Sequence, residues 1–377
     1  MRIYFDHAAT SPIRFEVQEF LSNHENLKFY NPSSVHVEGQ KARSSINNAR
    51  DLIASLLKSD PDNILFTSSG TESCNYAINM AIDIHAIKNI IYLPTEHSAV
   101  IDPIINKKIN KYQCKITSEG LIDLEDFQKC LKKTKENTLV CVMLLNNETG
   151  IIQPIEQVSK LCNEHGAYLF SDMIQAIGKI DVSTFIKMVD FASFASHKVG
   201  GIHGVGMVYF KDKIKIYRDI FGGAQEFGRR GGTENVIGIL AFAIALEASY
   251  AKLADENKKY NLLYNKLVSG LNEISNKIII PSQNSLKHSS ISTVIFPGVK
   301  AENLIIGLDL EGIAVSAGAA CSSGKIGGSH VLKAMNYTKE HAMSAIRLSF
   351  GWNNNEEQVQ FFLDSINNLL QGMKFKY

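Results

Sequence analysis

The sequence lacks paired cysteines, long apolar runs and any excess of one charge. Its six cysteines are scattered without a CxxC pair, which argues against a structural zinc site and a disulfide framework. No apolar run reaches the roughly 18 residues that a membrane helix needs. The formal net charge is +1 over 377 residues. We therefore expect no resident metal, no direct contact with nucleic acid and no association with a membrane.

The N-terminal residues MRIYFDHAAT also lack the apolar segment of a secretory signal, so we expect a cytoplasmic protein. Apolar residues make up 45% of the chain and charged residues 20%, which is an ordinary composition for a globular protein. The chain contains no internal repeat and no low-complexity tract. Its length is sufficient for a large core and for two domains.

Short apolar runs alternate with helical patterns between about residues 60 and 210, which predicts an α/β fold with a mostly parallel central sheet. A long helical stretch from Thr233 to about Glu273 contains no proline, and we interpret it as the connector to a second, smaller α/β unit. A capping box at Asn354 and Glu357 predicts a final helix. The expected elements are Ile64–Phe66, Ile90–Leu93, Leu139–Leu145, Tyr168–Ser171, Phe191–Ala195 and Val205–Phe210, then Ser292–Phe296, Glu302–Leu310 and Ile313–Ser316 in the second unit.

Polar residues follow five of the expected strands, in the segments TSSGTES, PTEH, NNETG, DMIQ and SHK. The carboxyl ends of parallel strands face the ligand crevice of an open α/β sheet. Each polar residue alone has an ordinary explanation, such as a helix N-cap for Asp172, but five such strand ends are harder to attribute to chance. If the strands run parallel, the side chains that converge are Thr71, His97, Asn147, Asp172, Gln175, His197 and Lys198.

These residue types suit a site for pyridoxal 5'-phosphate (PLP). The cofactor needs a lysine amine for its imine, which Lys198 can supply. Its pyridine nitrogen needs a carboxylate partner, for which Asp172 is the candidate, and its ring oxygen needs a neutral donor, for which Gln175 is suited. A flat side chain such as His97 can stack on the ring and can also move protons.

The cofactor's phosphate needs backbone N–H groups at a helix N-terminus, together with hydroxyl donors. The segment Ser69-Gly70-Thr71 opens a helix at Glu72 and offers both kinds of donor. His197 can add a further donor. The glycine-rich segment Gly200–Gly206 precedes a strand instead of opening a helix, so we interpret it as a tight turn and not as the dinucleotide loop of a dehydrogenase.

One cysteine differs in its surroundings from the other five. Cys74, Cys114, Cys130, Cys141 and Cys162 lie in apolar or helix-like contexts and are expected to be buried. Cys321 lies in SAGAACSSGKIGGS, whose small residues cannot form much of a core. This favours a chemical role over a packing role for Cys321.

Together these segments resemble the cysteine desulfurases of the NifS/IscS type, in the class V aminotransferase superfamily with the fold-type I PLP architecture. The small-residue loop around the cysteine is similar to that of group I of this family. We expect an N-terminal segment (residues 1–15) packed with the small domain, a large PLP-binding domain (16–255) and a small C-terminal domain (256–377). The resemblance spans the chain and rests on YFDHAAT, NPSSVH, TEH, NNETG, DMIQ, SHK, GRRGGTEN and SAGAACSSGKIGGSHVLKAM.

The resemblance implies PLP-dependent removal of sulfur from L-cysteine. Lys198 would hold the cofactor and then move the α-proton of the substrate. Cys321, as a thiolate, would attack the substrate sulfur, leaving L-alanine and a protein persulfide. The implied acceptors are an iron–sulfur scaffold protein, with Cys321 as a transient cluster ligand, or tRNA thiolation proteins.

The resemblance also assigns the binding residues. Arg347 would clamp the substrate carboxylate through its bidentate guanidinium, assisted by Asn31 and Asn147. Thr233 would reach the phosphate in the other subunit, which implies a homodimer. The residues implied for the cofactor are Gly70, Thr71, His97, Asn147, Asp172, Gln175, Ser196, His197, Lys198 and Thr233.

One position departs from the family pattern. Family members carry a hydroxyl residue three positions before the lysine. This chain has Ala195 at that position and a serine, Ser196, at the next. Neighbouring side chains of a strand face opposite ways, so we expect Ser196 not to reach the phosphate in place of the missing hydroxyl. We expect weaker retention of PLP by roughly 1–2 kcal/mol.

Three other functions remain open from the sequence. A selenocysteine lyase on the same scaffold can be distinguished from a cysteine desulfurase only by comparing the turnover of selenocysteine with that of cysteine. A small-substrate aminotransferase needs no thiol such as Cys321. A non-catalytic scaffold protein would have no need to keep Lys198, Asp172, His97, Arg347 and Cys321 together.

Overall fold

The computed structural model describes residues 2–134, 137–211, 218–317 and 328–372. Its larger part is built on a seven-stranded sheet in the order β2-β8-β7-β6-β5-β3-β4. Strand β8 is antiparallel to both neighbours, and the other six run in one direction, which confirms the predicted, mostly parallel sheet. The strands are β2 (Ile64–Thr67), β3 (Asn89–Tyr92), β4 (Asn110–Gln113), β5 (Thr138–Cys141), β6 (Tyr168–Asp172), β7 (Phe191–Ala195) and β8 (Gly206–Phe210).

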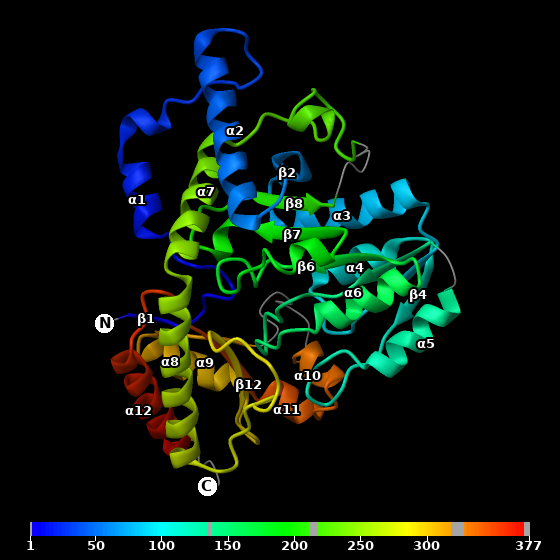
Figure 1. Cartoon of the computed structure of the whole chain (residues 1–377). Helices are drawn as coiled ribbons and strands as arrows, with labels where there is room; N and C mark the ends of the chain where they lie inside the picture. The colour runs from blue at the N-terminus through cyan, green and yellow to red at the C-terminus, as the bar shows by residue number, and fades with distance from the viewer. Residues whose placement is uncertain (1, 135–136, 212–217, 318–327, 373–377) are drawn as a thin grey trace.

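Helices cover both faces of this sheet, as Figure 1 shows. Strand side chains alternate between the two faces, so that Leu65 packs with α3 and α4 whereas Phe66 packs in the core below α2 and α7. The covering helices are α1 (Phe15–Ser22), α2 (Val37–Leu57), α3 (Gly70–His85), α4 (Ser98–Asn106), α5 (Leu124–Thr134), α6 (Ile155–Glu164) and α7 (Val236–Ala251).

Strand β4 was not expected from the sequence. Residues 110–113 are absent from the expected elements, but they form the edge strand of the sheet. Its residues are exposed except for the half-buried Tyr112. Lysine on an edge strand is a common protection against pairing with another chain, so Lys111 suits this position.

The helical connector is two helices and not one. Helix α7 ends at Ala251, α8 (Leu253–Ile274) follows, and their axes are bent by 70°. Helix α7 lies in the core of the large sheet, whereas α8 packs Leu263 and Leu267 into a second core, so each helix follows its own packing surface. Among the described residues no single helix is long and apolar enough to cross a membrane, and only this bent pair reaches that length and composition.

The second core lies under a three-stranded sheet in the order β11-β12-β9. The chain's start contributes to it, because β1 (Ile3–Tyr4) pairs with β10 (Ile313–Ala314) and Phe5 is buried there. The domain limits at residues 15 and 255 stay a prediction. The remaining elements are β9 (Ile291–Ile295), β11 (Ser316–Ala317), β12 (Ala345–Ser349), α9 (Ala301–Leu310), α10 (His330–Ala334), α11 (Lys339–Met343) and α12 (Glu356–Gly372).

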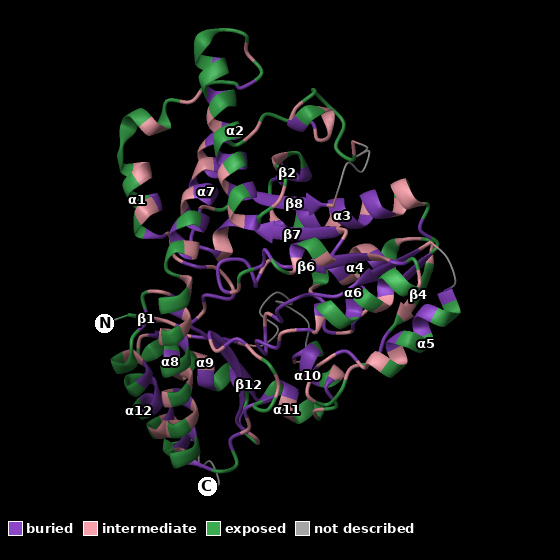
Figure 2. Cartoon of the chain, viewed as in Figure 1, coloured by how far each residue is buried: buried purple, intermediate pink, exposed green. Residues whose placement is uncertain are grey.

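The capping box of α12 is displaced by one residue from the predicted pair Asn354 and Glu357. The N–H of Gln358 donates to Asn355 Oδ1 at 3.0 Å, and the N–H of Asn355 donates back to Gln358 Oε1 at 3.3 Å. Asn354 Oδ1 instead accepts from the N–H of Gly351. Buried and exposed stretches alternate along α12 (Figure 2). Its residues in the second core are Val359, Phe362, Leu363, Ile366 and Leu370.

Candidate active site

A cavity of about 250 Å³ lies where the carboxyl ends of β5, β6 and β7 meet the N-terminus of α3. The strand-end residues therefore converge as the parallel sheet predicts. Arg347 reaches the same cavity from β12. The predicted residues that line it are Gly70, Thr71, His97, Asn147, Asp172, Gln175, His197, Lys198 and Arg347.

Lys198 projects into this cavity from the 3₁₀ turn Ser196–Lys198, which follows β7. Its Nζ donates to the carbonyl oxygens of Ala8 and Ala9, each at 2.7 Å. The N-terminal segment therefore forms one wall of the site. Sequence reasoning assigned no residue of this segment to the site, and the only available signal was the resemblance of YFDHAAT to the family's start.

Asp172 ends β6 with its carboxyl group buried in the cavity wall. Burial raises the pKa of this carboxyl to about 6, although the Ile174 N–H at 2.9 Å and the charge of Lys198 act in the opposite direction. A cationic ligand atom beside Asp172 would restore its ionised form, because an opposite charge offsets desolvation. The arrangement suits the protonated nitrogen of a pyridine ring.

His97 is held as a neutral ring. It is the N-cap of α4, and its Nδ1 accepts from the N–H of Ala99 at 3.1 Å, so the hydrogen of the neutral ring lies on Nε2. Burial lowers the pKa of His97 to about 4, and the neighbouring Lys198 acts in the same direction. The ring is thus fixed in orientation and can stack on a flat ligand or exchange a proton through Nε2.

Gln175 is oriented by a buried lysine that the sequence did not single out. Lys179 Nζ donates to the Gln175 carbonyl oxygen at 3.1 Å and lies 3.5 Å from Oε1. The Gln175 amide nitrogen therefore faces the other way and donates to Ala8 O at 2.7 Å. One N–H of that amide remains for a ligand.

The N-terminus of α3 forms the end of the cavity suited to an anion. Ser69 is its N-cap, with Oγ accepting from the Glu72 N–H at 3.1 Å. Gly70 is closely packed, because a Cβ there would lie 2.6 Å from the terminal methyl carbon of Ile174, which would have to shift, and 3.1 Å from the Cβ of Ala195. Backbone N–H groups and His197 can thus approach a phosphate from two sides.

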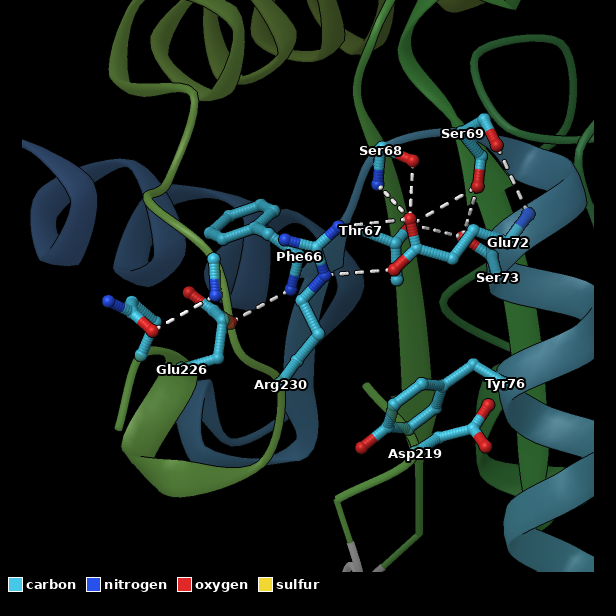
Figure 3. Close-up of polar contacts among 12 residues, drawn as sticks. Phe66, Thr67, Ser68, Ser69, Glu72, Ser73, Tyr76, Asp219, Glu226 and Arg230 are labelled. Carbon is cyan, nitrogen blue, oxygen red and sulfur yellow. Dashed lines mark hydrogen bonds and ion pairs between the residues drawn. The ribbon is translucent and has the colours of Figure 1, made fainter. Parts of the chain in front are cut away.

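The loop of residues 221–235 is tied to this helix terminus, as Figure 3 shows. Arg230 donates from Nε and Nη2 to the two carboxylate oxygens of Glu72, at 2.9 and 3.1 Å. Glu72 also accepts from the N–H of Ser68 at 2.8 Å. A second contact lies deeper, where the buried Glu226 pairs with Arg50 at 2.6 Å and accepts from the Phe66 N–H.

Arg347 stands at the opposite side of the cavity. Its Nη2 pairs with Asp6 at 2.7 Å, and its Nη1 donates to the carbonyl oxygen of Asn147 at 3.1 Å. Its buried Nε has no hydrogen-bond partner in the described part of the chain. Behind it, Glu148 accepts from Ser329, and burial raises the pKa of Glu148 to about 7. Because these contacts use only some of its N–H groups, the Arg347 guanidinium retains donors for an anionic ligand.

Three predicted site residues that the structure describes are not brought to the cavity. Ser196 is buried, but its Oγ points at Gly201, where a Cβ would come within 2.1 Å of it. Ser196, the first residue of the 3₁₀ turn after β7, thus faces away from the cavity, so its hydroxyl does not stand where Ala195 lacks one. Asn31 and Thr233 are exposed outside the cavity of this chain. Cys321 lies outside the described residues.

Acidic, histidine and cysteine side chains do not gather into a metal site in the described ranges, where no group of three or more is suitably placed. The five predicted buried cysteines are indeed buried. Burial raises the pKa of each of these thiols. They are therefore poor sources of thiolate near neutral pH.

Comparison with known proteins agrees with this geometry. The aminotransferase class-V family model matches residues 3–362. Cysteine desulfurase IscS of Dictyoglomus turgidum is 35% identical over 380 residues, which cover 99% of this chain and 95% of that protein. Putative cysteine desulfurase IscS 1 of Bacillus subtilis is 35% identical over 367 residues, with 95% and 96% covered.

A solved structure of a NifS-like protein shares the fold with a TM-score of 0.91 at 34% identity, and covers 99% of this chain and 100% of that one. This agreement confirms the expected fold of NifS-like PLP enzymes. The chain therefore belongs to the aminotransferase class-V family, in its IscS/NifS-like group.

Proposed function

We propose that this protein is a PLP-dependent cysteine desulfurase that converts L-cysteine to L-alanine and leaves the sulfur on Cys321. The observation that carries the proposal is that the buried carboxyl of Asp172 and the amine of Lys198 line the same cavity. Asp172 suits a pyridinium nitrogen and Lys198 suits an aldehyde. The anion-binding end at Gly70 lies in the same cavity and suits the phosphate.

PLP fits the described residues, and when bound it supplies an electron sink for the bond-breaking step at the substrate's α-carbon. The protein supplies the rest. Asp172 keeps the ring nitrogen protonated, and Gln175 can donate to the ring oxygen. His97 offers a flat neutral ring for stacking. Lys198 lies where an amine can take up and return the α-proton.

Arg347 is the proposed anchor of the substrate carboxylate. Arg347 lines the cavity and its Nε is buried without a partner in the described residues, and a guanidinium with unused donors favours an anionic ligand. A carboxylate bound there would share the guanidinium with Asp6, whose Oδ1 lies 2.7 Å from Arg347 Nη2. We expect Asn147, beside it, to complete the contact.

The sulfur step is assigned to Cys321. Its thiolate attacks the substrate sulfur, so that an S–S bond forms as the substrate's C–S bond breaks and the carbon product leaves as alanine. The other five thiols are buried with raised pKa values, which leaves Cys321 as the suited nucleophile. The persulfide is then passed to an acceptor, such as an iron–sulfur scaffold or a tRNA thiolation protein.

A homodimer is part of the proposal, with Thr233 completing the phosphate site of the partner subunit. Several large apolar side chains are exposed in the single chain, two of them in the segments that carry Asn31 and Thr233. Phe15 is 72%, Val35 is 88% and Phe221 is 85% exposed. An interface between two copies would bury such side chains.

The test is incubation of the purified, PLP-loaded protein with L-cysteine and quantification of alanine. We expect alanine in the presence of a reductant that turns over the persulfide, and none from Lys198→Ala. A parallel reaction with selenocysteine separates a desulfurase from a selenocysteine lyase. A colourless protein that binds no PLP and forms no alanine would instead indicate a non-catalytic scaffold.

A further inference from the structure

The hydroxyl of Thr10 lies between two imidazole rings at the edge of the cavity. Its Oγ1 is 3.1 Å from His197 Nδ1 and 3.1 Å from His203 Nε2. The two rings are stacked, with centroids 5.2 Å apart and planes inclined by 28°. His203 comes from the glycine-rich loop Gly200–Gly206, which the sequence marks only as a turn.

The single hydrogen of the Thr10 hydroxyl restricts which of the three groups donates and which accepts. A threonine hydroxyl has one hydrogen and can donate to only one of the two rings. If Thr10 donates to His197 Nδ1, the Nε2 of His203 must carry a hydrogen and donate to Thr10. In the reverse arrangement, His197 Nδ1 donates to Thr10, and Thr10 donates to His203.

The two arrangements leave the same atom, His197 Nε2, for a ligand but differ in whether it carries a hydrogen. Burial lowers the pKa of His197 to about 3, with Lys198 and His203 acting in the same direction, so the ring is neutral and has one N–H. Its Nδ1 is occupied by Thr10, which leaves Nε2 for a ligand. In the first arrangement Nε2 donates, whereas in the second it presents a lone pair that repels an anion.

We propose that Thr10 and His203 are positioning residues that keep the hydrogen of His197 on Nε2, where it donates to the phosphate of PLP. This inference rests on the PLP site proposed above. It has added weight in this chain because Ala195 lines the cavity without a hydroxyl and Ser196 points away. Because no hydroxyl at position 195 can donate to the phosphate, phosphate binding depends more strongly on a donated hydrogen from His197.

The test compares binding of PLP with binding of pyridoxal, which lacks the phosphate. The full-length, PLP-free protein is titrated with each compound, and binding is followed by visible absorbance. Thr10→Val removes the hydroxyl, and His203→Phe keeps a stacked ring without nitrogen. We expect each to weaken PLP binding, by roughly fivefold to tenfold for Thr10→Val, and to leave pyridoxal binding unchanged. Thr10→Ser, the matched control, should behave as wild type.

The double variant should bind PLP no more weakly than Thr10→Val alone, because both changes interrupt the same chain of hydrogen bonds. Unchanged PLP binding in both single variants would overturn the inference, and so would an equal loss for PLP and pyridoxal. If Thr10→Val binds neither compound, the same comparison of PLP with pyridoxal is made with His203→Phe, because His203 is exposed and its replacement disturbs the fold less. Failure of the wild-type protein to bind either compound would instead remove the proposed function itself, and the inference with it.

Discussion

At the scale of single residues, the site combines expected chemistry with contacts that sequence cannot reveal. Asp172, His97 and Lys198 follow from strand ends and from the needs of the cofactor. The carbonyls of Ala8 and Ala9, which receive the Lys198 amine, do not, because a backbone carbonyl has no signature in the residue type. The same holds for Lys179, whose contact with Gln175 depends on how the chain turns between these two residues.

Ala195 gives the first prediction at this scale. Ala195→Ser places a hydroxyl in the cavity next to Gly70 and should tighten PLP binding by about 1–2 kcal/mol, or roughly five- to thirtyfold in Kd. Titration of the PLP-free protein measures this. Ser196→Ala is the matched control and should leave the affinity unchanged, because Ser196 faces Gly201. No gain from Ala195→Ser would show that the missing hydroxyl has no energetic role.

Asp172 gives a prediction about pH. Burial raises its folded pKa from 3.8 to about 6, so the folded PLP-free protein binds more protons than the unfolded chain between these values. Its stability contribution therefore falls as pH rises from about 4 to about 6 and stays low above. Asp172→Asn removes this cost, which is about 3 kcal/mol at most.

We therefore expect PLP-free Asp172→Asn to unfold at higher urea concentration than wild type at pH 7.5, with the advantage disappearing near pH 4. The same variant should bind PLP more weakly, because the ring nitrogen loses its counter-charge. Urea unfolding at both pH values and a PLP titration provide the measurements. A variant less stable than wild type at pH 7.5 would contradict the account.

At the scale of elements, the hydrophobic pattern predicted most of the parallel strands because each of these is a short run that is buried except for the half-buried Tyr92 and Tyr168. It did not predict β4, whose residues are mostly exposed and carry lysine. The pattern predicted a long helical stretch here but not the break at Lys252 between α7 and α8, because neither proline nor glycine marks it in the sequence. The capping box was misplaced by one residue because Asn354 and Asn355 are equally suited to the role.

The loop of residues 221–235 yields the prediction at this scale. Glu226 and Arg50 are both about 96% buried or more, so Glu226→Gln leaves a buried guanidinium without its counter-charge. We expect a loss of about 3–5 kcal/mol in the free energy of unfolding. Arg230→Gln, in the more accessible pair with Glu72, should cost about 1 kcal/mol or less. Similar losses for the two variants would show that the buried pair does not anchor this loop.

At the scale of the whole molecule, the account requires two chains for one complete site. Mixed dimers test this through Lys198→Ala and Thr233→Ala chains. Each homodimer has two defective sites, but a mixed dimer contains one site with both Lys198 and the partner's Thr233. We expect activity to return on mixing after subunit exchange, up to about half of wild type per mixed dimer. No recovery in demonstrated mixed dimers would place Thr233 outside the partner's site.

The central claim is that Cys321 receives the sulfur of L-cysteine, and peptide mass spectrometry after incubation with L-cysteine tests it most directly. The account predicts one added sulfur atom on Cys321 and none on the five buried cysteines, with alanine formed in equal amount. Cys321→Ser should keep the visible absorbance of the bound cofactor and its change on adding cysteine, yet form no persulfide. Continued sulfur removal by Cys321→Ser, or sulfur found on another cysteine, would contradict it.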